Sequence, residues 1–287
     1  METGDYLNLN GKILKKGKAL IFPDNHSFRY GDGCFETIRM NRGVMMLESY
    51  HFERLFSSLD KMQFTLPEYF TPDYLKTQIL ELWRKNAGGK MTRVRLTVFR
   101  GNGGLYDVEN HFPNFLIQTW PLEQATGQLN ENGLITDLYR DAQKICDQFS
   151  MIKSNNYLCY VMAAIWAKKN KLNDAFLLNP EHRISDSTIA NIFMLKDGCI
   201  FTPSLQEGCV GGTMRRYLLS SFRRENMPVQ ESTIEPGALF QASEIFLTNA
   251  ITGIRWVKQV GSNHYQHHMA RRLHREFIEP LFHGSNL

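Results

Sequence analysis

The sequence predicts an α+β fold in two domains, and three observations lead to this prediction. Strand-like and helix-like segments are mixed in both halves of the chain, without a regular strand–helix repeat. The 287 residues suffice for one large domain or two modest ones. A polar stretch with few bulky apolar residues separates the halves, and it fits a linker or a surface loop. We expect one domain at 1–121, a linker at 122–133 and a second domain at 134–287.

The elements of the first half follow from local patterns. An Asn-Gly turn inside an apolar stretch predicts a hairpin at 7–14. A short strand at 44–47 precedes an amphipathic helix, which is indicated by apolar residues at helical spacing: Phe52, Leu55, Phe56, Leu59 and Met62. The remaining elements expected here are a helix at 72–86, ended by a Gly-Gly pair, and strands at 92–99 and 115–119.

The second half has one dominant helical signal. Apolar residues at helical spacing predict an amphipathic helix there: Leu158, Val161, Met162, Ile165 and Trp166. The other elements expected are strands at 175–178, 192–195, 200–202 and 245–248, a helix at 214–224, and a basic helix in the last 20 or so residues.

Composition excludes several classes of function. The 33 Lys and Arg against 29 Asp and Glu are too balanced to favour nucleic acid or an anionic membrane as a partner. We see no secretion signal and no apolar run of the ~18–20 residues that cross a membrane. Five scattered cysteines without a CxxC pair fit no disulfide framework, so we expect a cytoplasmic protein. The histidines near the C-terminus lie among arginines, which indicates a solvated basic helix and no metal site.

Lys153 is the first candidate for chemistry. It follows the apolar pair Met151-Ile152 and precedes a helix whose N-cap we place at Ser154 or Asn155. The positive end of a helix and partial burial both disfavour an ammonium, and a neutral amine can form a Schiff base. From the local sequence alone, an ordinary exposed lysine is the alternative.

Three further features would suit an anionic, heterocyclic ligand. Arg54 lies off the apolar stripe of its helix, where its guanidinium could bind a phosphate through bidentate hydrogen bonds. The Gly211-Gly212 pair opens a helix whose free N–H groups can bind an anion. Asp186 would keep a heterocyclic nitrogen protonated, whereas Glu181 lies in an Asn-Pro turn and is a poor substitute. The alternatives are a solvated arginine, a simple glycine turn and a capping aspartate.

Six segments together resemble the class IV (fold type IV) pyridoxal-phosphate enzymes, over roughly residues 7–260. That family holds branched-chain aminotransferases, D-amino-acid transaminases and 4-amino-4-deoxychorismate lyases. Each segment alone is unspecific, but their shared order and spacing are specific. The segments are YGDGCFETIR (30–39), HFERL (51–55), IKSNNY (152–157), DSTIANIF (186–193), GTMR (212–215) and FLTNA (246–250).

The resemblance implies a homodimer whose chains have a small α/β N-terminal domain and a larger, α/β-barrel-like C-terminal domain. Pyridoxal 5'-phosphate (PLP) would be the cofactor, bound between the two domains, with Lys153 in the larger domain as the Schiff-base lysine and proton shuttle. Arg54 would bind the phosphate, and Asp186 would face the ring nitrogen. Asn156 or Tyr157 would hydrogen-bond near the ring oxygen. The rest of the phosphate cup would come from Gly212, Thr213, Met214, Asn249 and Ala250.

Two departures from the family pattern bear on function. Most members have Glu where this chain has Asp186, which is one methylene shorter. The Arg-x-His pair of D-amino-acid transaminases is absent from 102–107, which makes that role less favoured. We expect a transaminase acting on a branched-chain-like amino acid and a 2-oxo acid, with Phe35 and Tyr106 lining the substrate site. The alternatives are an aminodeoxychorismate lyase, which releases pyruvate and 4-aminobenzoate, and a cofactor-binding protein without activity.

Overall fold

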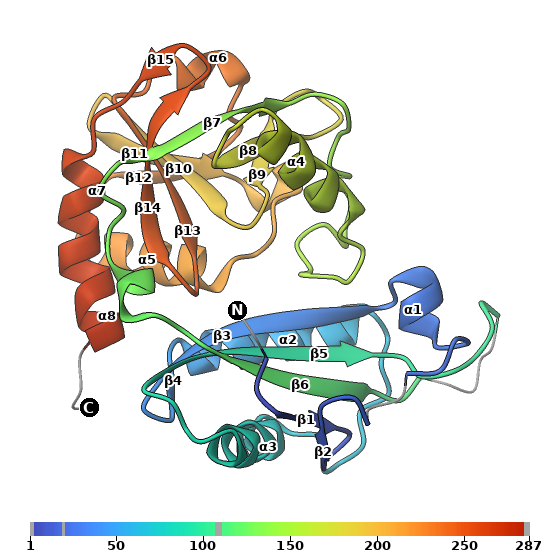
Figure 1. The fold of residues 1–287 in the computed structure, drawn as a ribbon. Coiled ribbons are helices and arrows are strands. Elements are labelled where there is room, and N and C mark those ends of the chain that lie inside the picture. The colour runs from blue at the N-terminus through green and yellow to red at the C-terminus, as the bar shows by residue number, and fades with distance from the viewer. Residues whose placement is uncertain (1–2, 19–20, 107–110, 284–287) are drawn as a thin grey trace. The chain divides into compact units, whose positions relative to one another are not determined.

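The computed structural model describes residues 3–18, 21–106 and 111–283, and these form two compact units (Figure 1). The first unit spans 1–126 together with 152–156, and the second spans 127–151 and 157–287. The short segment 152–156 therefore packs with the first unit although both of its flanks belong to the second. The expectation that the larger C-terminal domain carries Lys153 is corrected accordingly.

The first unit is built on an antiparallel six-stranded sheet, in the order β2-β1-β6-β5-β3-β4. The hairpin expected at 7–14 is present, and Asn10 and Gly11 both have positive φ, as a type I′ turn requires. The strands are β1 (Tyr6–Leu9), β2 (Lys12–Lys15), β3 (Gly33–Asn41), β4 (Val44–Met45), β5 (Met91–Phe99) and β6 (Asn114–Pro121).

Two long helices, α2 (Glu48–Lys61) and α3 (Pro72–Lys85), pack on this sheet, and a short α1 (His26–Tyr30) precedes β3. Both long helices were predicted from apolar spacing. The hydroxyl of Thr71 accepts a hydrogen bond from the N–H of Tyr74, and Pro72 occupies the first turn, so α3 begins where the sequence indicates. Their apolar faces fill the core with Phe52, Leu55, Leu59, Leu75, Ile79 and Leu82.

The second unit contains a mixed nine-stranded sheet, in which eight strands follow the order β12-β11-β10-β13-β14-β7-β8-β9 and β15 pairs with β14. The sheet curls, because β9 at one edge also approaches β10 and β11. The strands are β7 (Leu134–Tyr139), β8 (Asp174–Leu178), β9 (Ile184–Ser187), β10 (Asn191–Lys196), β11 (Cys199–Pro203), β12 (Val229–Ser232), β13 (Glu244–Asn249), β14 (Gly253–Val260) and β15 (Asn263–His264).

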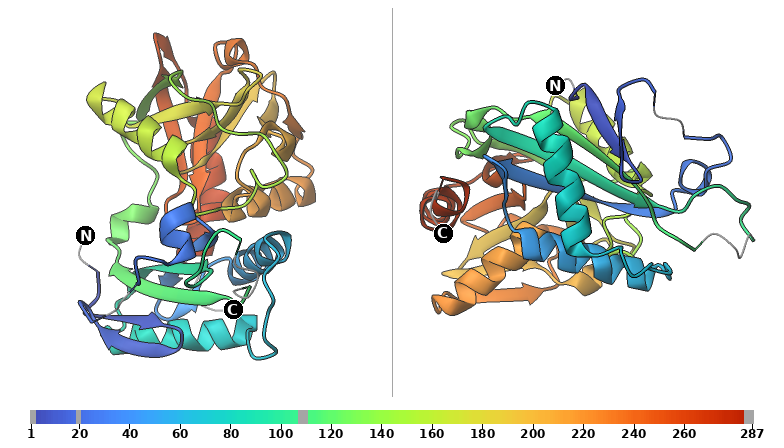
Figure 2. Two further views of the ribbon diagram at one scale, coloured as in Figure 1. Left: turned by 90° about the vertical axis from the view of Figure 1, so that its right-hand side faces the viewer. Right: turned by 90° about the horizontal axis from the view of Figure 1, so that it is seen from below.

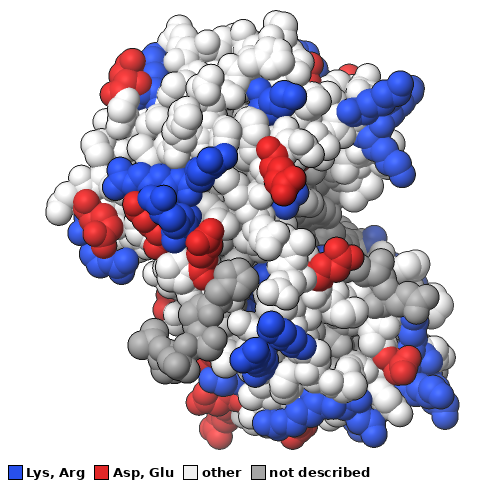
Figure 3. All heavy atoms as spheres, turned by 60° about the vertical axis from the view of Figure 1, so that its left-hand side comes forward, with Lys and Arg blue, Asp and Glu red and all other residues white. Residues whose placement is uncertain are grey.

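Helices surround this curled sheet. They are α4 (Leu158–Lys169), α5 (Thr213–Arg224), α6 (Pro236–Leu239), α7 (His268–Leu273) and α8 (Glu279–His283). None of the helices in the described ranges is long and apolar enough to cross a membrane. On the face drawn in Figure 3, basic and acidic side chains lie interspersed, as the balanced composition indicates.

The helix α4 forms over the apolar positions that predict it, but most of its large apolar residues do not face the core. Leu158, Val161, Met162 and Ile165 are between 43% and 69% exposed. The buried face consists of Tyr160, Ala163 and Ala167 instead. The small alanines allow α4 to lie close over β7 and β8 (Figures 1 and 2), so the bulky side chains remain outside.

The expected linker and one of the C-terminal histidines pack against the second unit, although the sequence predicts a linker or loop and a solvated helix. Within 122–133, Asn130 exchanges hydrogen bonds with Trp256, so this segment is docked on β14. His274 is buried, and its Nε2 lies 2.9 Å from the carbonyl oxygen of Gly127. The solvated basic helix expected here is therefore wrong for His274, which packs into the second unit.

Candidate active site

The backbone of residues 153–155 extends the sheet of the first unit along the start of β3. The N–H of Phe35 donates to the carbonyl of Lys153 at 2.9 Å, and the N–H of Asn155 donates to the carbonyl of Gly33 at 2.8 Å. A Cβ at position 33 would lie 2.6 Å from the backbone carbonyl oxygen of Val98 and 2.6 Å from the side-chain nitrogen of Asn155, so only glycine fits here. Lys153 is thus fixed by ladder bonds, and the predicted helix cap at 154 or 155 is wrong, because α4 begins only after Tyr157.

The Lys153 side chain lies over the ring of Phe35. Its Nζ is 4.7 Å from the ring centroid, and the guanidinium carbon of Arg95 is 3.7 Å from the same centroid. Such cation–π contacts are favourable for both charges. Phe35 itself is buried, so it forms an apolar surface beneath the amine.

Arg54 is held by a buried carboxylate. Its Nε donates to Oε1 of Glu36 at 2.8 Å and its Nη2 donates to Oε2 at 2.5 Å. His51, one turn earlier on α2, places Nδ1 2.6 Å from the same Oε2. Glu36 therefore fixes both side chains, and it was not singled out from the sequence. The signal in the sequence would have been a glutamate inside a largely apolar strand, followed by a helix that carries His51 and Arg54 on one face.

The charges in this group balance. Burial raises the pKa of Glu36, but the charge of Arg54 and the hydrogen bonds from Arg54 and His51 outweigh burial and lower the pKa to about 2. Burial lowers the pKa of His51. The charge of Glu36 raises it in part, and the positive charges of Arg54 and Lys153 lower it further. The group at neutral pH is therefore an ionised Glu36 with the cation of Arg54 and a neutral His51 that donates through Nδ1.

Asp186 lies on β9 of the second unit and is buried among hydrogen-bond donors. Its Oδ2 accepts bonds from the Tyr160 hydroxyl at 3.1 Å and from the Val210 N–H at 2.8 Å. Its Oδ1 accepts a bond from the amide of Asn191 at 2.9 Å. Three donors stabilise the ionised form of a carboxylate. Tyr160 and Asn191 were not singled out for this contact from the sequence.

The start of α5 adjoins the same group. Gly212 is the N-cap of this twelve-residue helix, and a Cβ there would come within 1.9 Å of Oδ1 of Asn191. Thr213 and Met214 form the buried first turn, where backbone N–H groups have no partner within the helix. Such a start can bind an anion. Asn191 therefore lies between the two features: it donates a hydrogen bond to Asp186 and packs against Gly212 at the N-terminus of α5.

The other predicted residues have contacts of their own. Asn249 accepts hydrogen bonds at Oδ1 from the N–H groups of Ile251 and Thr252, so its side chain shapes the turn after β13. Tyr157 stacks on Tyr160, with ring centroids 4.3 Å apart. Asn156 and half-exposed Ala250 offer backbone groups. Tyr106 is 91% exposed and lines no enclosed surface in the described part of the chain.

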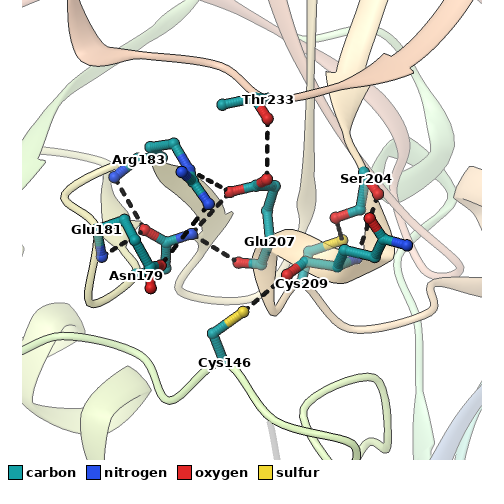
Figure 4. Close-up of polar contacts among 9 residues, drawn as sticks. Cys146, Asn179, Glu181, Arg183, Ser204, Glu207, Cys209 and Thr233 are labelled. Carbon is teal, nitrogen blue, oxygen red and sulfur yellow. Dashed lines mark hydrogen bonds and ion pairs between the residues drawn. The ribbon is translucent and has the colours of Figure 1, made fainter.

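A second buried carboxylate of the second unit, Glu207, is fully used by its own neighbours (Figure 4). It accepts bonds from Asn179, Arg183 and Thr233. Asn179 in turn accepts from the N–H of Glu181, which lies in the turn that the sequence predicts. These contacts hold the turn after β8. The described residues contain no cluster of three His, Cys, Asp or Glu arranged for a metal ion.

Comparison with known proteins places this geometry in a family. Residues 33–260 match the family described as amino-transferase class IV. A Methanocaldococcus jannaschii protein, provisionally named a branched-chain-amino-acid aminotransferase, is 28% identical over 248 residues, which are 86% of this chain and 84% of that protein. The aminodeoxychorismate lyase of Bacillus subtilis is 25% identical over 248 residues, covering 86% and 83% of the two chains.

Solved structures show the same fold. The branched-chain aminotransferase of the thermophilic archaeon Thermoproteus uzoniensis, solved with norvaline, superposes with a TM-score of 0.88 at 21% sequence identity. The match covers 97% of this chain and 95% of that one. The prediction of a mixed α and β architecture of fold type IV, with a curled barrel-like sheet, is confirmed.

Proposed function

The chain belongs to the class IV aminotransferase family, and on this premise we propose that it transfers an amino group between a branched-chain-like amino acid and a 2-oxo acid. The family consists of PLP-dependent enzymes. The observation that carries the proposal is Lys153, whose backbone is fixed by ladder bonds against β3, the strand that also carries Glu36, and whose Nζ lies 4.7 Å from the centroid of the Phe35 ring. An amine held in place is what a lysine nucleophile and base requires.

The donor sets suit the two ends of the cofactor. The guanidinium of Arg54 and the first turn of α5 are both anion ligands, which suits a phosphate. Glycine at 212 lets the start of α5 lie against Asn191, because a Cβ there would clash with the Asn191 side chain. The buried carboxylate of Asp186, with its three donors, suits a protonated ring nitrogen. We assign Arg54, Gly212, Thr213 and Met214 to the phosphate and Asp186 to the ring.

Each residue then has a defined task. When bound, PLP supplies a ring that accepts negative charge from the substrate α-carbon. The amine of Lys153 removes the α-proton and returns it. Asp186 holds a proton at the ring nitrogen by its charge. Asn156 or Tyr157 is assigned to the ring oxygen, and the backbone at 249–250 to the phosphate cup.

The substrate side is assigned to Phe35 and Tyr106. Phe35 offers an apolar ring directly beneath the amine of Lys153, which suits an aliphatic side chain. Tyr106 is exposed in the single chain, so we assign it a substrate contact only within the homodimer that we propose next. We also propose a homodimer. The exposed apolar face of α4, formed by Leu158, Val161, Met162 and Ile165, supports this proposal, because contiguous exposed apolar residues are typical of surfaces that contact another protein.

The chemical test is a borohydride reduction of the PLP-loaded protein followed by peptide mass spectrometry. We expect a phosphopyridoxyl group on the peptide that contains Lys153. Lys153→Ala should show no adduct and no turnover while its circular dichroism stays that of the wild type. Lys169→Ala, at the exposed end of α4, is the matched control and should keep both. An adduct that persists in Lys153→Ala would overturn the assignment.

The alternative is an aminodeoxychorismate lyase, and the similarity to the Bacillus subtilis enzyme of that name supports it. The two reactions differ in what they consume. Glutamate formed from 2-oxoglutarate with leucine or valine indicates the transaminase. Pyruvate released from aminodeoxychorismate without any 2-oxo acid indicates the lyase.

A further inference from the structure

We propose that Tyr160 and Lys144 are positioning residues that hold the Asp186 carboxylate in place and in its anionic form for the ring nitrogen of PLP. The inference rests on the proposed function. Asp186 is buried and has a short side chain, with a single methylene group between its Cα and its carboxylate. Such a side chain has little reach of its own, so its neighbours must orient the carboxylate, and it must keep its charge while buried.

Tyr160 supplies the aim. It projects from the first turn of α4, is buried, and donates its hydroxyl to Oδ2 of Asp186 at 3.1 Å. Tyr157 stacks on its ring with an interplanar angle of 18°, which fixes the ring's orientation. Burial raises the pKa of Tyr160 well above its ordinary value, and the charge of Asp186 raises it further, so the hydroxyl stays a donor.

Lys144 supplies the charge. Its side chain is buried, and its ammonium donates to the carbonyl of Ser150 at 3.1 Å and lies 5.8 Å from the Tyr160 ring centroid. The backbone N–H of Lys144 donates to the carbonyl oxygen of Leu178 at 2.8 Å. Leu178 ends β8, and its neighbour Leu177 pairs with Asp186 on β9. Burial lowers the pKa of Lys144, and among the groups that oppose this the charge of Asp186 acts most strongly.

The other groups around Asp186 cannot replace this cation. Burial, and after it the charge of Asp186, raises the pKa of the Cys209 thiol to about 12, so this group stays neutral. Asn191 and the Val210 N–H are neutral donors. A positive charge from Lys144 and a fixed hydroxyl from Tyr160 therefore favour an anionic Asp186.

The test measures the protonation of the cofactor's ring nitrogen by 15N NMR, with PLP labelled at that atom and bound to the full chain. The wild type should show a protonated nitrogen at pH 8. Tyr160→Phe and Lys144→Met should each lower the apparent pKa of that nitrogen by about one unit, which is a tenfold change in its proton affinity. Tyr139→Phe, a buried tyrosine of the same unit, and Lys169→Met are the matched controls and should match the wild type.

The outcomes separate this inference from the proposed function. Asp186→Asn should leave the ring nitrogen neutral. If it does, and both Tyr160→Phe and Lys144→Met retain the wild-type signal, the positioning role is overturned while the function stands. If Asp186→Asn also keeps a protonated nitrogen, or the wild type binds no PLP, the proposed function fails first. Should Lys144→Met not fold, Tyr160→Phe alone decides, since it removes one oxygen from an otherwise unchanged ring.

Discussion

Replacing Glu36 by glutamine tests whether this carboxylate organises the charged group of the first unit. Glutamine keeps the size of the side chain and removes its charge. Arg54 would lose an anionic partner that it contacts through two N–H groups, and His51 would lose the acceptor of its Nδ1–H. The cation of Arg54, which is mostly buried, would then have no neutralising charge at Glu36.

The magnitude follows from the pKa of Glu36. The difference between the ordinary value of 4.5 and about 2 corresponds to about 3 kcal/mol of folding free energy. Because the folded-state pKa is the lower one, this stabilisation is fully present above pH 4.5 and is lost as the pH falls through about 2. Glu36→Gln should therefore cost about 3 kcal/mol at pH 7 but only about 1.5 kcal/mol at pH 3.

The assay is urea unfolding at both pH values, followed by tryptophan fluorescence and circular dichroism. The matched control is Glu48→Gln, because Glu48 pairs with Lys76 at 2.7 Å where both side chains are about a third or more exposed. That pair should contribute about 0.5 kcal/mol or less. Equal losses for the two variants at pH 7, or a Glu36→Gln loss that is the same at pH 3 and pH 7, would refute the reasoning.

Two further substitutions test the second unit. Gly212→Ala should destabilise the protein by about 2 kcal/mol and weaken PLP binding, because the added Cβ meets Asn191; Gly237→Ala, with nothing within 4 Å, is the control, and equal unfolding midpoints would contradict the prediction. Ile165→Glu should convert the proposed dimer to a monomer in light scattering, whereas Val44→Glu at a similarly exposed apolar position should not; a dimer retained in Ile165→Glu would exclude this face of α4.

Local signals in the sequence account for much of the fold. The Asn10-Gly11 turn has positive φ at both residues, which few other pairs tolerate, so its hairpin is readable directly. The apolar stripe of α2 and the Thr71-Pro72 start of α3 are equally local. Each of these features depends on neighbours within about four residues along the chain, which is the range that a single sequence displays.

The helix α4 shows why the same reasoning fails elsewhere. Apolar periodicity finds a helix, but it identifies the buried face only when the other face is polar. Here Ala163 and Ala167 form one face and the larger Val161, Met162 and Ile165 lie on the other, so both faces are apolar. Hydrophobicity alone favours the larger residues, whereas close packing over β7 and β8 selects the smaller ones.

The candidate site was predictable in its residue types but not in its electrostatics. Lys153, Arg54 and Asp186 follow from motifs, yet the partner of Arg54 comes from β3 and that of Asp186 from α4, 18 and 26 residues away in sequence. These partners decide the charge. An arginine has five N–H donors in a planar fork, and Glu36 takes two of them while neutralising the cation. A phosphate at Arg54 would therefore be selected by hydrogen-bond geometry more than by net charge, which explains why arginine suits this position better than lysine.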